Sequence, residues 1–342
     1  SYRYIETPLR KGYWFGKRWK TIIVGGGVIV TLSGGLFALG EPLKGQLYTG
    51  KIIQTSRPKF LSGEKCLENA SYSTICFFID NKKNQTLWML GDSHTESLYL
   101  AGKKFSNSFG MNLKIYYIGG TAFPPVYKYR KDRKKGDLRR LDDSKFVEKE
   151  LYKQIKVGDI ILLSMRFPYH FGGTYYGFPP SNFAFLRKDG SFGSQENSFD
   201  EWIASVINFA NMAQRKGAKV IIQTPSPEWE QNNIIPKCST SNLQYFNSLQ
   251  KIDCQIKSKF FIDQETGLYR HLFEKLNKLS ASHKNIHLFD TYKIVCPEST
   301  CSFTRNGIDI YRDDNHISYE WARDNLSPMI YKFINEIQTT DK

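Results

Sequence analysis

The chain has 342 residues, of which 40% are hydrophobic, 24% charged and 15% aromatic. These proportions are those of a globular protein and exclude a disordered, collagen-like or low-complexity chain. Lys and Arg number 48 against 33 Asp and Glu, a formal net charge of +15, and most of the excess lies within residues 1–20 and 128–140. Because the charge is concentrated in two short segments, a nucleic-acid surface is not favoured, and we expect no nucleic-acid partner.

The first segment with a clear pattern is residues 21–39, TIIVGGGVIVTLSGGLFAL, which carries no charged side chain. As a helix it would span about 28 Å, close to the thickness of a bilayer core. Trp14 and Trp19 precede it, at the position where aromatic side chains gather at membrane interfaces. The segment therefore predicts one transmembrane helix, with a cleaved signal peptide and a buried core helix as the alternatives.

The charges and the cysteines predict how such a helix would be oriented. The basic residues before it are expected to stay in the cytoplasm, which places residues after 40 outside, in a compartment such as a bacterial periplasm. All six cysteines lie beyond the helix, as expected for an oxidising compartment. No cysteine pair has metal-ligand spacing with histidines nearby, so no metal is expected. The cysteine spacing favours neighbouring pairs, although it leaves the connectivity open: Cys66–Cys76, Cys238–Cys254 and Cys296–Cys301.

Beyond residue 84 the sequence alternates between strand-like and helix-like patterns. Short apolar runs typical of strands buried on both faces occupy residues 86–90, 112–118, 159–164, 219–224 and 286–289. Helical patterns occupy residues 95–107, 145–155, 200–216, 269–279 and 318–337. This alternation predicts an α/β fold over residues 85–342, a three-layer α/β/α sandwich around a five-stranded parallel sheet. Residues 40–84 are interpreted as a linker and entry segment of this domain, not as a separate domain, and residues 169–197 as a long surface excursion.

Two short motifs carry the chemistry of the predicted domain, and the first is Gly91-Asp92-Ser93-His94. It stands where the strand 86–90 ends and a helix begins, and the carboxyl ends of parallel strands are where catalytic groups collect. A helix N-terminus at that point stabilises developing negative charge, so Ser93 is a candidate nucleophile. The alternative is an ordinary strand-to-helix turn with Ser93 as the N-cap.

The second motif, Asp313-Asp314-Asn315-His316, comes shortly before the last predicted helix. A serine needs a base to become nucleophilic, and the spacing of Asp313 and His316 lets one loop present a carboxylate that orients an imidazole. The alternative is a helix N-terminus capped by Ser318, with solvated acids before it. Together the two motifs predict a catalytic triad of Ser93, His316 and Asp313.

The pair of motifs, GDSH at 91–94 and DDNH at 313–316, resembles the SGNH hydrolase superfamily over residues 84–338. The details are similar to the SGNH domains fused to the C-terminus of bacterial acyltransferase-3 membrane proteins, because SYRYIETPLRK at 1–11 resembles the end of that membrane domain. The resemblance implies a flavodoxin-like sheet. It also implies that residues 1–20 are a cytoplasmic-side remnant of the membrane domain, followed by the helix 21–39.

The resemblance implies O-acyl transfer, usually of acetyl, onto a sugar hydroxyl of a bacterial surface polysaccharide or lipopolysaccharide. Ser93 would be the nucleophile, His316 the general base and then the acid, and Asp313 the residue that orients His316. The chain would bind no cofactor, and the acyl group would come from acetyl-CoA through the membrane domain. The implied partners are that membrane domain, membrane lipid and the glycan acceptor, with the C-terminal domain on the periplasmic side of the inner membrane.

An acyl-transfer site also needs oxyanion donors. The Ser93 amide and the loop IGGTAFPP, with Gly119 and Gly120, are the candidates, although the two glycines also suit a simple turn. The superfamily's Gly-x-Asn motif is missing after the strand 159–164, where the chain has Ser-Met-Arg-Phe. Arg166 is therefore a candidate site residue, with a structural salt bridge as the alternative. The remaining histidines are expected at the surface or in the core: His170, His271, His283 and His287.

Two other functions remain open from the sequence. A carbohydrate esterase would use the same catalytic residues, and only the remnant of the membrane domain argues against it. A non-catalytic glycan-binding module would use the aromatic stretch 169–185 as its platform. The basic segment 128–140 would either contact anionic glycan or lipid headgroups or form a solvated insertion.

Overall fold

The computed structural model describes residues 18–40, 74–131, 139–172, 180–187, 189–229, 255–257, 268–297, 300–306 and 308–339. Its first element, helix α2 (Arg18–Gly40), covers the apolar segment 21–39. Within the described part of the chain, no helix combines the length and the hydropathy that crossing a bilayer requires, so the transmembrane prediction is not confirmed. Residues 1–17 and 41–73, which include most of the predicted remnant and linker, lie outside the described residues.

The centre of the domain is a six-stranded sheet with the order β1-β3-β2-β6-β9-β11. Its strands are β1 (Thr74–Ile79), β2 (Thr86–Gly91), β3 (Asn112–Ile118), β6 (Ile160–Ser164), β9 (Lys219–Gln223) and β11 (Ile286–Phe289). The five strands predicted from the sequence run parallel, while β1 pairs antiparallel with β3. Strand β2 lies between β3 and β6, so the turn that follows β2 is flanked by the carboxyl ends of these two strands.

Strand β1 adds a sixth strand to the five that the sequence predicts, and it extends the sheet to residues 74–79, before the predicted start of the domain at residue 85. Its register pairs Cys76 with Tyr116 and Phe77 with Ile115, and the side chains of Cys76 and Phe77 are buried. A short edge strand is held by pairing with the strand beside it. The alternation of strand and helix patterns does not detect β1, because no helix follows it before β2.

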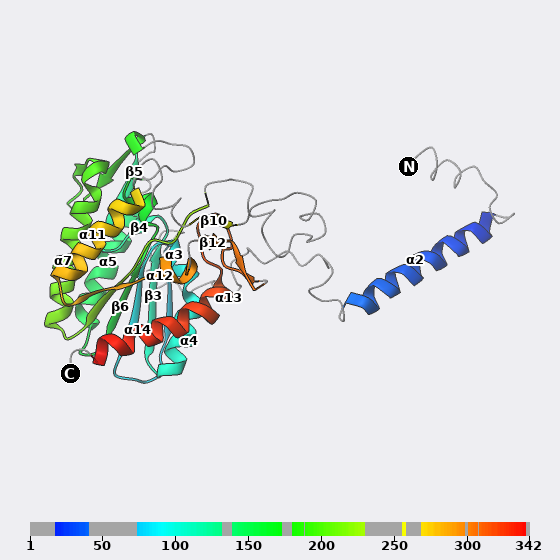
Figure 1. Ribbon diagram of the computed structural model, residues 1–342, viewed down its shortest axis with the longest axis horizontal. Helices are drawn as coiled ribbons and strands as arrows, with labels where there is room; N and C mark the ends of the chain where they lie inside the picture. The colour runs from blue at the N-terminus through cyan, green and yellow to red at the C-terminus, as the bar shows by residue number, and fades with distance from the viewer. Residues whose placement is uncertain are drawn as a thin grey trace.

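Helices cover both faces of the sheet, as Figure 1 shows. One face is covered by α4 (Tyr99–Phe109), α13 (Tyr319–Trp321) and α14 (Ser327–Thr339), and the other by α5 (Arg139–Gln154), α7 (Ser198–Arg215) and α11 (Leu268–Ser282). Successive residues of β2 point to opposite faces, so Leu87 and Met89 pack in one core while Trp88 and Leu90 pack in the other. The predicted three-layer α/β/α arrangement is confirmed.

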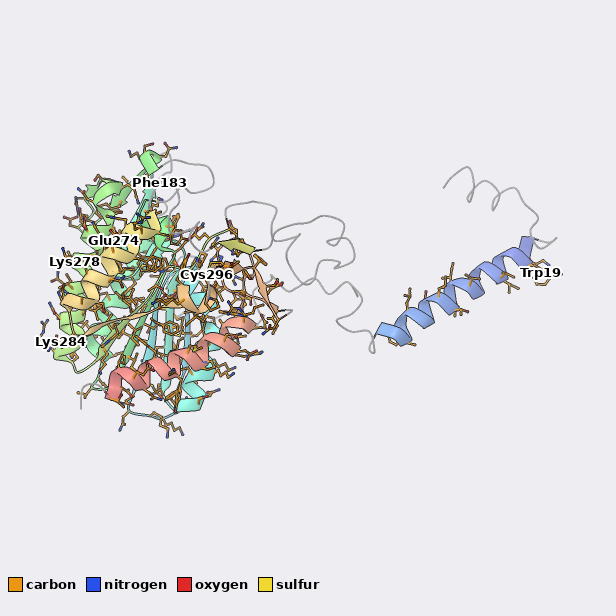
Figure 2. All side chains as sticks on the ribbon, in the orientation of Figure 1. Trp19, Phe183, Glu274, Lys278, Lys284 and Cys296 are labelled. Atoms are coloured by element: carbon orange, nitrogen blue, oxygen red, sulfur yellow. A yellow bond between two sulfur atoms is a disulfide. The ribbon has the colours of Figure 1, made fainter. Side chains whose placement is uncertain are left out.

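Helix α11 is amphipathic, and its apolar face packs in the core. Leu272, Leu276 and Leu279 are buried, at the spacing of a single helical face. Glu274 and Lys278 are exposed and lie on its outward side in Figure 2. Burial of each leucine contributes about 1.5 to 3 kcal/mol, which is why this face packs against the sheet.

Residues 121–193 include a small antiparallel sheet that the sequence did not predict. Its strands, in spatial order, are β4 (Thr121–Ala122), β5 (Val126–Arg130), β7 (Phe183–Leu186) and β8 (Phe192–Gly193). Phe171, Phe183 and Phe185 are buried, and the Phe171 ring lies 5.3 Å from that of Trp202 on α7. These phenylalanines anchor part of residues 169–197 in the core, which corrects the interpretation of the whole stretch as a surface excursion, whereas residues 189–192 are exposed.

The remaining elements are short. They are α3 (Ser93–Ser97), α6 (Phe167–His170), α12 (Thr291–Val295), β10 (Gln255–Lys257), β12 (Thr300–Ser302), β13 (Thr304–Arg305), β14 (Ile308–Asp309), two 3-10 turns (Pro180–Asn182 and Gln195–Asn197) and a π-helical turn (Ala322–Leu326). Cys296 and Cys301 form a disulfide bond. Cys76 is also disulfide-bonded, but its predicted partner Cys66 and the predicted pair Cys238–Cys254 lie outside the described residues.

The end of β2 leaves no room for a side chain at Gly91. A Cβ atom there would lie 1.8 Å from the carbonyl oxygen of Ser164 on β6, and the φ of +149° is unfavourable for other residues. Gly91→Ala should lower the free energy of unfolding by about 3 kcal/mol or more, measured by urea unfolding.

Gly190→Ala is the matched control for this prediction. Gly190 also has a positive φ, +87°, but no atom lies within 4 Å of the position that a Cβ would take there. Only the backbone strain of about 1 to 2 kcal/mol is therefore expected. Equal losses for the two variants would show that the contact with Ser164 does not limit position 91.

Candidate active site

The candidate nucleophile lies in the turn between β2 and α3. Asp92 caps α3, because its carboxylate accepts a hydrogen bond from the His94 amide at 2.9 Å. The Thr95 hydroxyl donates to the Ser164 carbonyl at 2.7 Å and ties the helix to the end of β6. Ser93 is the first residue of α3, where helical amides have no acceptor within the helix. The turn thus presents Ser93 at the carboxyl edge of the sheet.

The loop of the second motif is closed by backbone pairing at its base. Tyr311 and Ile317 form an antiparallel bridge, and the Arg312 amide donates to the His316 carbonyl at 2.9 Å. Ser318 then caps α13, since its hydroxyl oxygen accepts from the Trp321 amide at 3.3 Å. The loop therefore has a defined shape between the sheet and the last helices.

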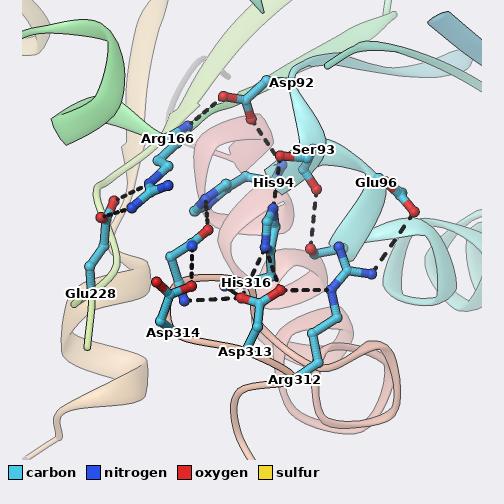
Figure 3. Close-up of polar contacts among 12 residues, drawn as sticks. Asp92, Ser93, His94, Glu96, Arg166, Glu228, Arg312, Asp313, Asp314 and His316 are labelled. Carbon is cyan, nitrogen blue, oxygen red and sulfur yellow. Dashed lines mark hydrogen bonds and ion pairs between the residues drawn. The ribbon is translucent and has the colours of Figure 1, made fainter. Parts of the chain in front are cut away.

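Ser93, His316 and Asp313 are joined by hydrogen bonds, as Figure 3 shows. The Ser93 hydroxyl donates to His316 Nε2 at 2.8 Å, and His316 Nδ1 donates to Asp313 Oδ2 at 2.7 Å. These distances allow the Ser93 proton to pass to His316 while Asp313 stabilises the imidazolium that forms. The structure thus brings together the three residues singled out in the sequence, from segments 223 residues apart.

The surroundings of Asp313 keep its carboxyl ionised. Burial opposes the charge, but hydrogen bonds from the His316 side chain, the His316 amide at 2.6 Å and the Asn315 amide at 3.0 Å outweigh it. They hold the pKa of Asp313 well below its usual range. An ionised Asp313 keeps a proton on His316 Nδ1, so that Nε2 faces Ser93 as an acceptor.

His94 is buried beside the triad. Its Nε2 donates to Asn315 Oδ1 at 3.2 Å, and its ring centre lies 4.9 Å from that of His316. Burial lowers the pKa of His94 to about 3, although the nearby Asp92 carboxylate opposes the shift. His94 is therefore neutral at physiological pH and adds no positive charge next to His316.

Asp92 links three parts of the chain at the edge of the sheet. Besides the His94 amide, its carboxylate accepts hydrogen bonds from the Arg166 amide at 2.9 Å and from His170 Nε2 at 2.8 Å. Burial opposes the charge, but the hydrogen bonds from His170 and from the Arg166 amide hold the pKa of Asp92 well below its usual range. His170 is thus a core histidine that contacts Asp92, in the turn that carries Ser93.

Arg166 stands two residues after Ser164, the last residue of β6, which pairs with Gly91 at the end of β2. Its guanidinium forms a bidentate ion pair with Glu228, with Nε to Oε1 at 3.0 Å and Nη2 to Oε2 at 2.6 Å. The salt bridge that was the alternative for Arg166 is therefore formed. No sequence signal indicated Glu228, because the pair depends on the adjacency of β6 and β9.

Gly119 and Gly120 form the turn between β3 and β4. Tyr117 pairs with Gly91, so Gly119 lies two residues beyond this pair, as Ser93 does on the neighbouring strand. The Gly119 carbonyl accepts a hydrogen bond from Arg140 Nη1 at 2.9 Å. The turn lies at the edge of the sheet where oxyanion donors are needed, and the role of its amides stays a prediction.

The basic segment 128–140 is not wholly a solvated surface. Lys128, on β5, is buried, and its Nζ donates to the Tyr169 carbonyl at 2.5 Å and lies 4.2 Å from the centre of the Phe183 ring. Burial lowers the pKa of Lys128 to about 7. Residues 132–138 lie outside the described residues. Lys128 is therefore a core residue, which fits neither of the two interpretations of the whole segment.

The fold and the hydrogen-bonded Ser–His–Asp set define an α/β/α domain of the kind that transfers or hydrolyses acyl groups. Residues 64–330 match the protein family described as "SGNH domain (fused to AT3 domains)". The match spans most of the chain, and the chain therefore belongs to this family.

The solved structures that are similar to the chain have low sequence identity to it, and they include the following two. The periplasmic domain of a lipopolysaccharide acetyltransferase from Salmonella ser. Paratyphi A is 16% identical, with a TM-score of 0.47, over 73% of this chain and 83% of that one. A GDSL-like lipase from Bacteroides thetaiotaomicron is 13% identical, with a TM-score of 0.40, over 75% of this chain and 89% of that one. No curated protein matches the sequence.

The low pKa of His94 predicts a pH dependence of stability. An unfolded histidine titrates near the ordinary value of 6.5, so below that pH the unfolded chain binds a proton that folded His94 does not. The free energy of unfolding should therefore fall as the pH decreases from 6.5 towards about 3. In His94→Gln there is no imidazole to titrate at this position. The free energy of unfolding should therefore decrease less with falling pH than in the parent chain, by up to about 1.4 kcal/mol per pH unit.

Urea unfolding of the parent chain and of His94→Gln at about pH 7.5 and about pH 5 tests this prediction. The two measurements at the higher pH are the control. A histidine is neutral there in both the folded and the unfolded chain, so the difference between the two chains is the effect of the substitution apart from protonation. The same decrease in both chains would contradict a neutral, buried His94.

Proposed function

We propose that this chain is an O-acyltransferase, with acetyl as its usual acyl group, which modifies sugar hydroxyls of a bacterial surface polysaccharide or lipopolysaccharide. The observation that carries the proposal is the hydrogen-bonded set of Ser93, His316 and Asp313 at the carboxyl edge of the sheet. Membership of a family described by its fusion to AT3 domains supports acyl chemistry.

In the first half-reaction, Ser93 Oγ attacks the carbonyl carbon of the acyl donor while His316 Nε2 takes the hydroxyl proton. The tetrahedral intermediate then collapses and breaks the bond between that carbon and the leaving atom of the donor. His316 gives its proton to the leaving group. The product is an ester on Ser93, with His316 neutral again.

In the second half-reaction, a sugar hydroxyl attacks the ester while His316 Nε2 takes the proton of that hydroxyl. Collapse of the second intermediate breaks the bond to Ser93 Oγ, and His316 returns the proton to Ser93. The acyl group has then moved to the sugar and the enzyme is restored. Asp313 stays ionised throughout and stabilises the imidazolium in both halves.

The negative charge of each intermediate needs donors at the same edge. We assign the Ser93 amide, at the start of α3, and the amides of the Gly119-Gly120 turn to this role. Arg166 stays a candidate for contact with the substrate, because its ion pair with Glu228 uses Nε and Nη2 and not Nη1.

The proposal places the source of the acyl group outside this domain. An acyltransferase-3 membrane domain would pass the acyl group from acetyl-CoA to Ser93, and this chain would hold no bound cofactor. The family description, which names fusion to AT3 domains, supports this partner. Membrane lipid and the glycan acceptor complete the expected surroundings.

An esterase is the second candidate, because water in place of the sugar hydroxyl turns the same residues to hydrolysis. The glycan-binding module is less well supported. It requires an aromatic platform in residues 169–185, whereas Phe171, Phe183 and Phe185 are buried in the described part of that stretch.

The test of the proposal follows the acetyl group. The full chain in detergent is given an activated acetyl ester and candidate oligosaccharides, and the products are identified by mass spectrometry. Ser93→Ala should reduce acetyl release and transfer by at least about 10³-fold, because no other group replaces the nucleophile. Ser108→Ala, which changes an exposed serine on α4, is the matched control and should keep full activity.

The products distinguish the candidates. Acetylated sugar that depends on Ser93 supports the transferase, and free acetate that depends on Ser93, with no sugar product, favours the esterase. Turnover that is indifferent to Ser93 contradicts both and leaves the binding module.

The proposal also includes attachment of the domain to the inner membrane, with the domain on the periplasmic side. Support comes from the sequence, because residues 21–39 carry no charge and follow a basic flank. The full chain, produced in a Gram-negative bacterium, should stay with membranes after alkaline extraction, whereas a chain that lacks residues 1–39 should be released. Release of both chains alike would contradict the anchor.

A further inference from the structure

A second set of contacts joins the same two segments as the triad, and Figure 3 shows its charged members. Arg312 immediately precedes Asp313, and its Nε lies 3.7 Å from Asp313 Oδ2. On its other side, Arg312 Nη1 lies 3.9 Å from Oε1 of Glu96 on α3, the helix that begins at Ser93. The guanidinium therefore stands between two carboxylates, one from each segment.

Tyr319, the first residue of α13, holds this arrangement in place. Its hydroxyl donates to Glu96 Oε1 at 2.8 Å and accepts a hydrogen bond from Arg312 Nη1. The Arg312 guanidinium also lies over the Tyr319 ring, 4.6 Å from its centre. The side chains of Glu96, Arg312 and Tyr319 thus form one compact group next to Asp313.

Burial makes the charges of this group depend on one another. The side chain of Glu96 is 1% exposed and that of Arg312 is 11% exposed. A buried charge is costly unless a charge of opposite sign lies near it, so Glu96 and Arg312 stabilise each other's ionised form, while Tyr319 and Asp313 also contact Arg312. Ser93 contacts His316, His316 contacts Asp313, and Asp313 contacts Arg312. Arg312 contacts Glu96, which lies on α3 together with Ser93, so the contacts form a closed ring.

We propose that Arg312, held by Glu96 and Tyr319, is a positioning residue that fixes the Asp313 carboxylate and sets how strongly it favours the protonated form of His316. The inference rests on the proposed function, in which His316 acts as the base. Arg312 touches neither substrate nor the reacting atoms, and it acts through Asp313. Glu96 in turn limits how much of the Asp313 charge Arg312 offsets.

This arrangement predicts opposite effects for the two charges. Without the Arg312 cation, more of the Asp313 charge acts on His316, its protonated form is favoured, and a higher pH is needed to free Nε2 for catalysis. Without the Glu96 charge, Arg312 offsets more of the Asp313 charge, and a lower pH is sufficient. A group with only a structural role would not give shifts of opposite sign.

Other charged and titratable groups near the His316 loop are unchanged in the variants whose pH profiles are compared, and they serve as a common background. Among the described residues these groups are Asp313 and Asp314 on the loop, Asp92, Ser93 and His94 at the start of α3, Arg166 after β6, Glu228 after β9 and Tyr319 on α13.

The test measures kcat/KM against pH for hydrolysis of p-nitrophenyl acetate by the full chain. The acid limb of the profile should move up by about 0.5 to 1 pH unit in Arg312→Gln and down by a similar or smaller amount in Glu96→Gln. The double variant should lie between the two. Shifts in the same direction, or no shift in either variant, would overturn the proposal.

Two further variants separate charge from folding. Arg312→Lys keeps the cation but not the planar fork, so its acid limb should lie closer to the parent than that of Arg312→Gln. Arg323→Gln is the matched control, because it removes a cation from an exposed pair with Asp324 and should leave the profile unchanged. Thermal unfolding of each variant identifies any that fail to fold.

A readout independent of activity distinguishes this proposal from the proposed function. The proton shared by His316 Nδ1 and Asp313 gives a downfield NMR signal, assigned by its loss in Asp313→Asn. The signal should move further downfield in folded Arg312→Gln, return towards its parent position in Arg312→Lys and stay unchanged in Arg323→Gln. If hydrolysis proves independent of Ser93, the proposed function fails and this signal alone decides the role of Arg312. An unchanged signal in Arg312→Gln would overturn that role.

Discussion

The hydrogen bond between Ser93 and His316 is the contact on which the candidate site depends, because it joins segments 223 residues apart in the sequence. Each partner is held by a different part of the fold. Ser93 is held by the turn that ends β2, in the middle of the sheet, and His316 by a loop closed through Tyr311 and Ile317. A movement of less than 1 Å at either end would take the pair out of hydrogen-bond range, so the packing of both segments serves this contact.

Buried charge is the second constraint at this edge of the sheet. Asp92 and Asp313 are kept ionised by donors that surround them, while burial keeps His94 neutral. An unpaired charge at such a depth would cost several kcal/mol, so the polar groups must be satisfied together. The ion pair of Arg166 with Glu228 follows the same rule on the other side of Ser93.

The candidate triad and most of the sheet could be predicted because their signals are local. The strands are continuous apolar runs, and the two motifs place Ser93, Asp313 and His316 at turns with recognisable residue types. Strand β1 and the small sheet β4-β5-β7-β8 could not be predicted, because a short strand is defined by the neighbour with which it pairs. Lys128 was assigned to a basic surface, since composition cannot show that a single lysine of the segment is buried against Phe183.

The sequence by itself determined the alternation of strands and helices, the two motifs and the family resemblance, since each depends on residues close together in the chain. Only the tertiary structure decided that His170 reaches Asp92, that Glu228 pairs with Arg166, and that Arg312 lies between Asp313 and Glu96. The reason is physical. These contacts require side chains from segments distant in the sequence to come within 4 Å of one another, and no local pattern specifies which segments become neighbours.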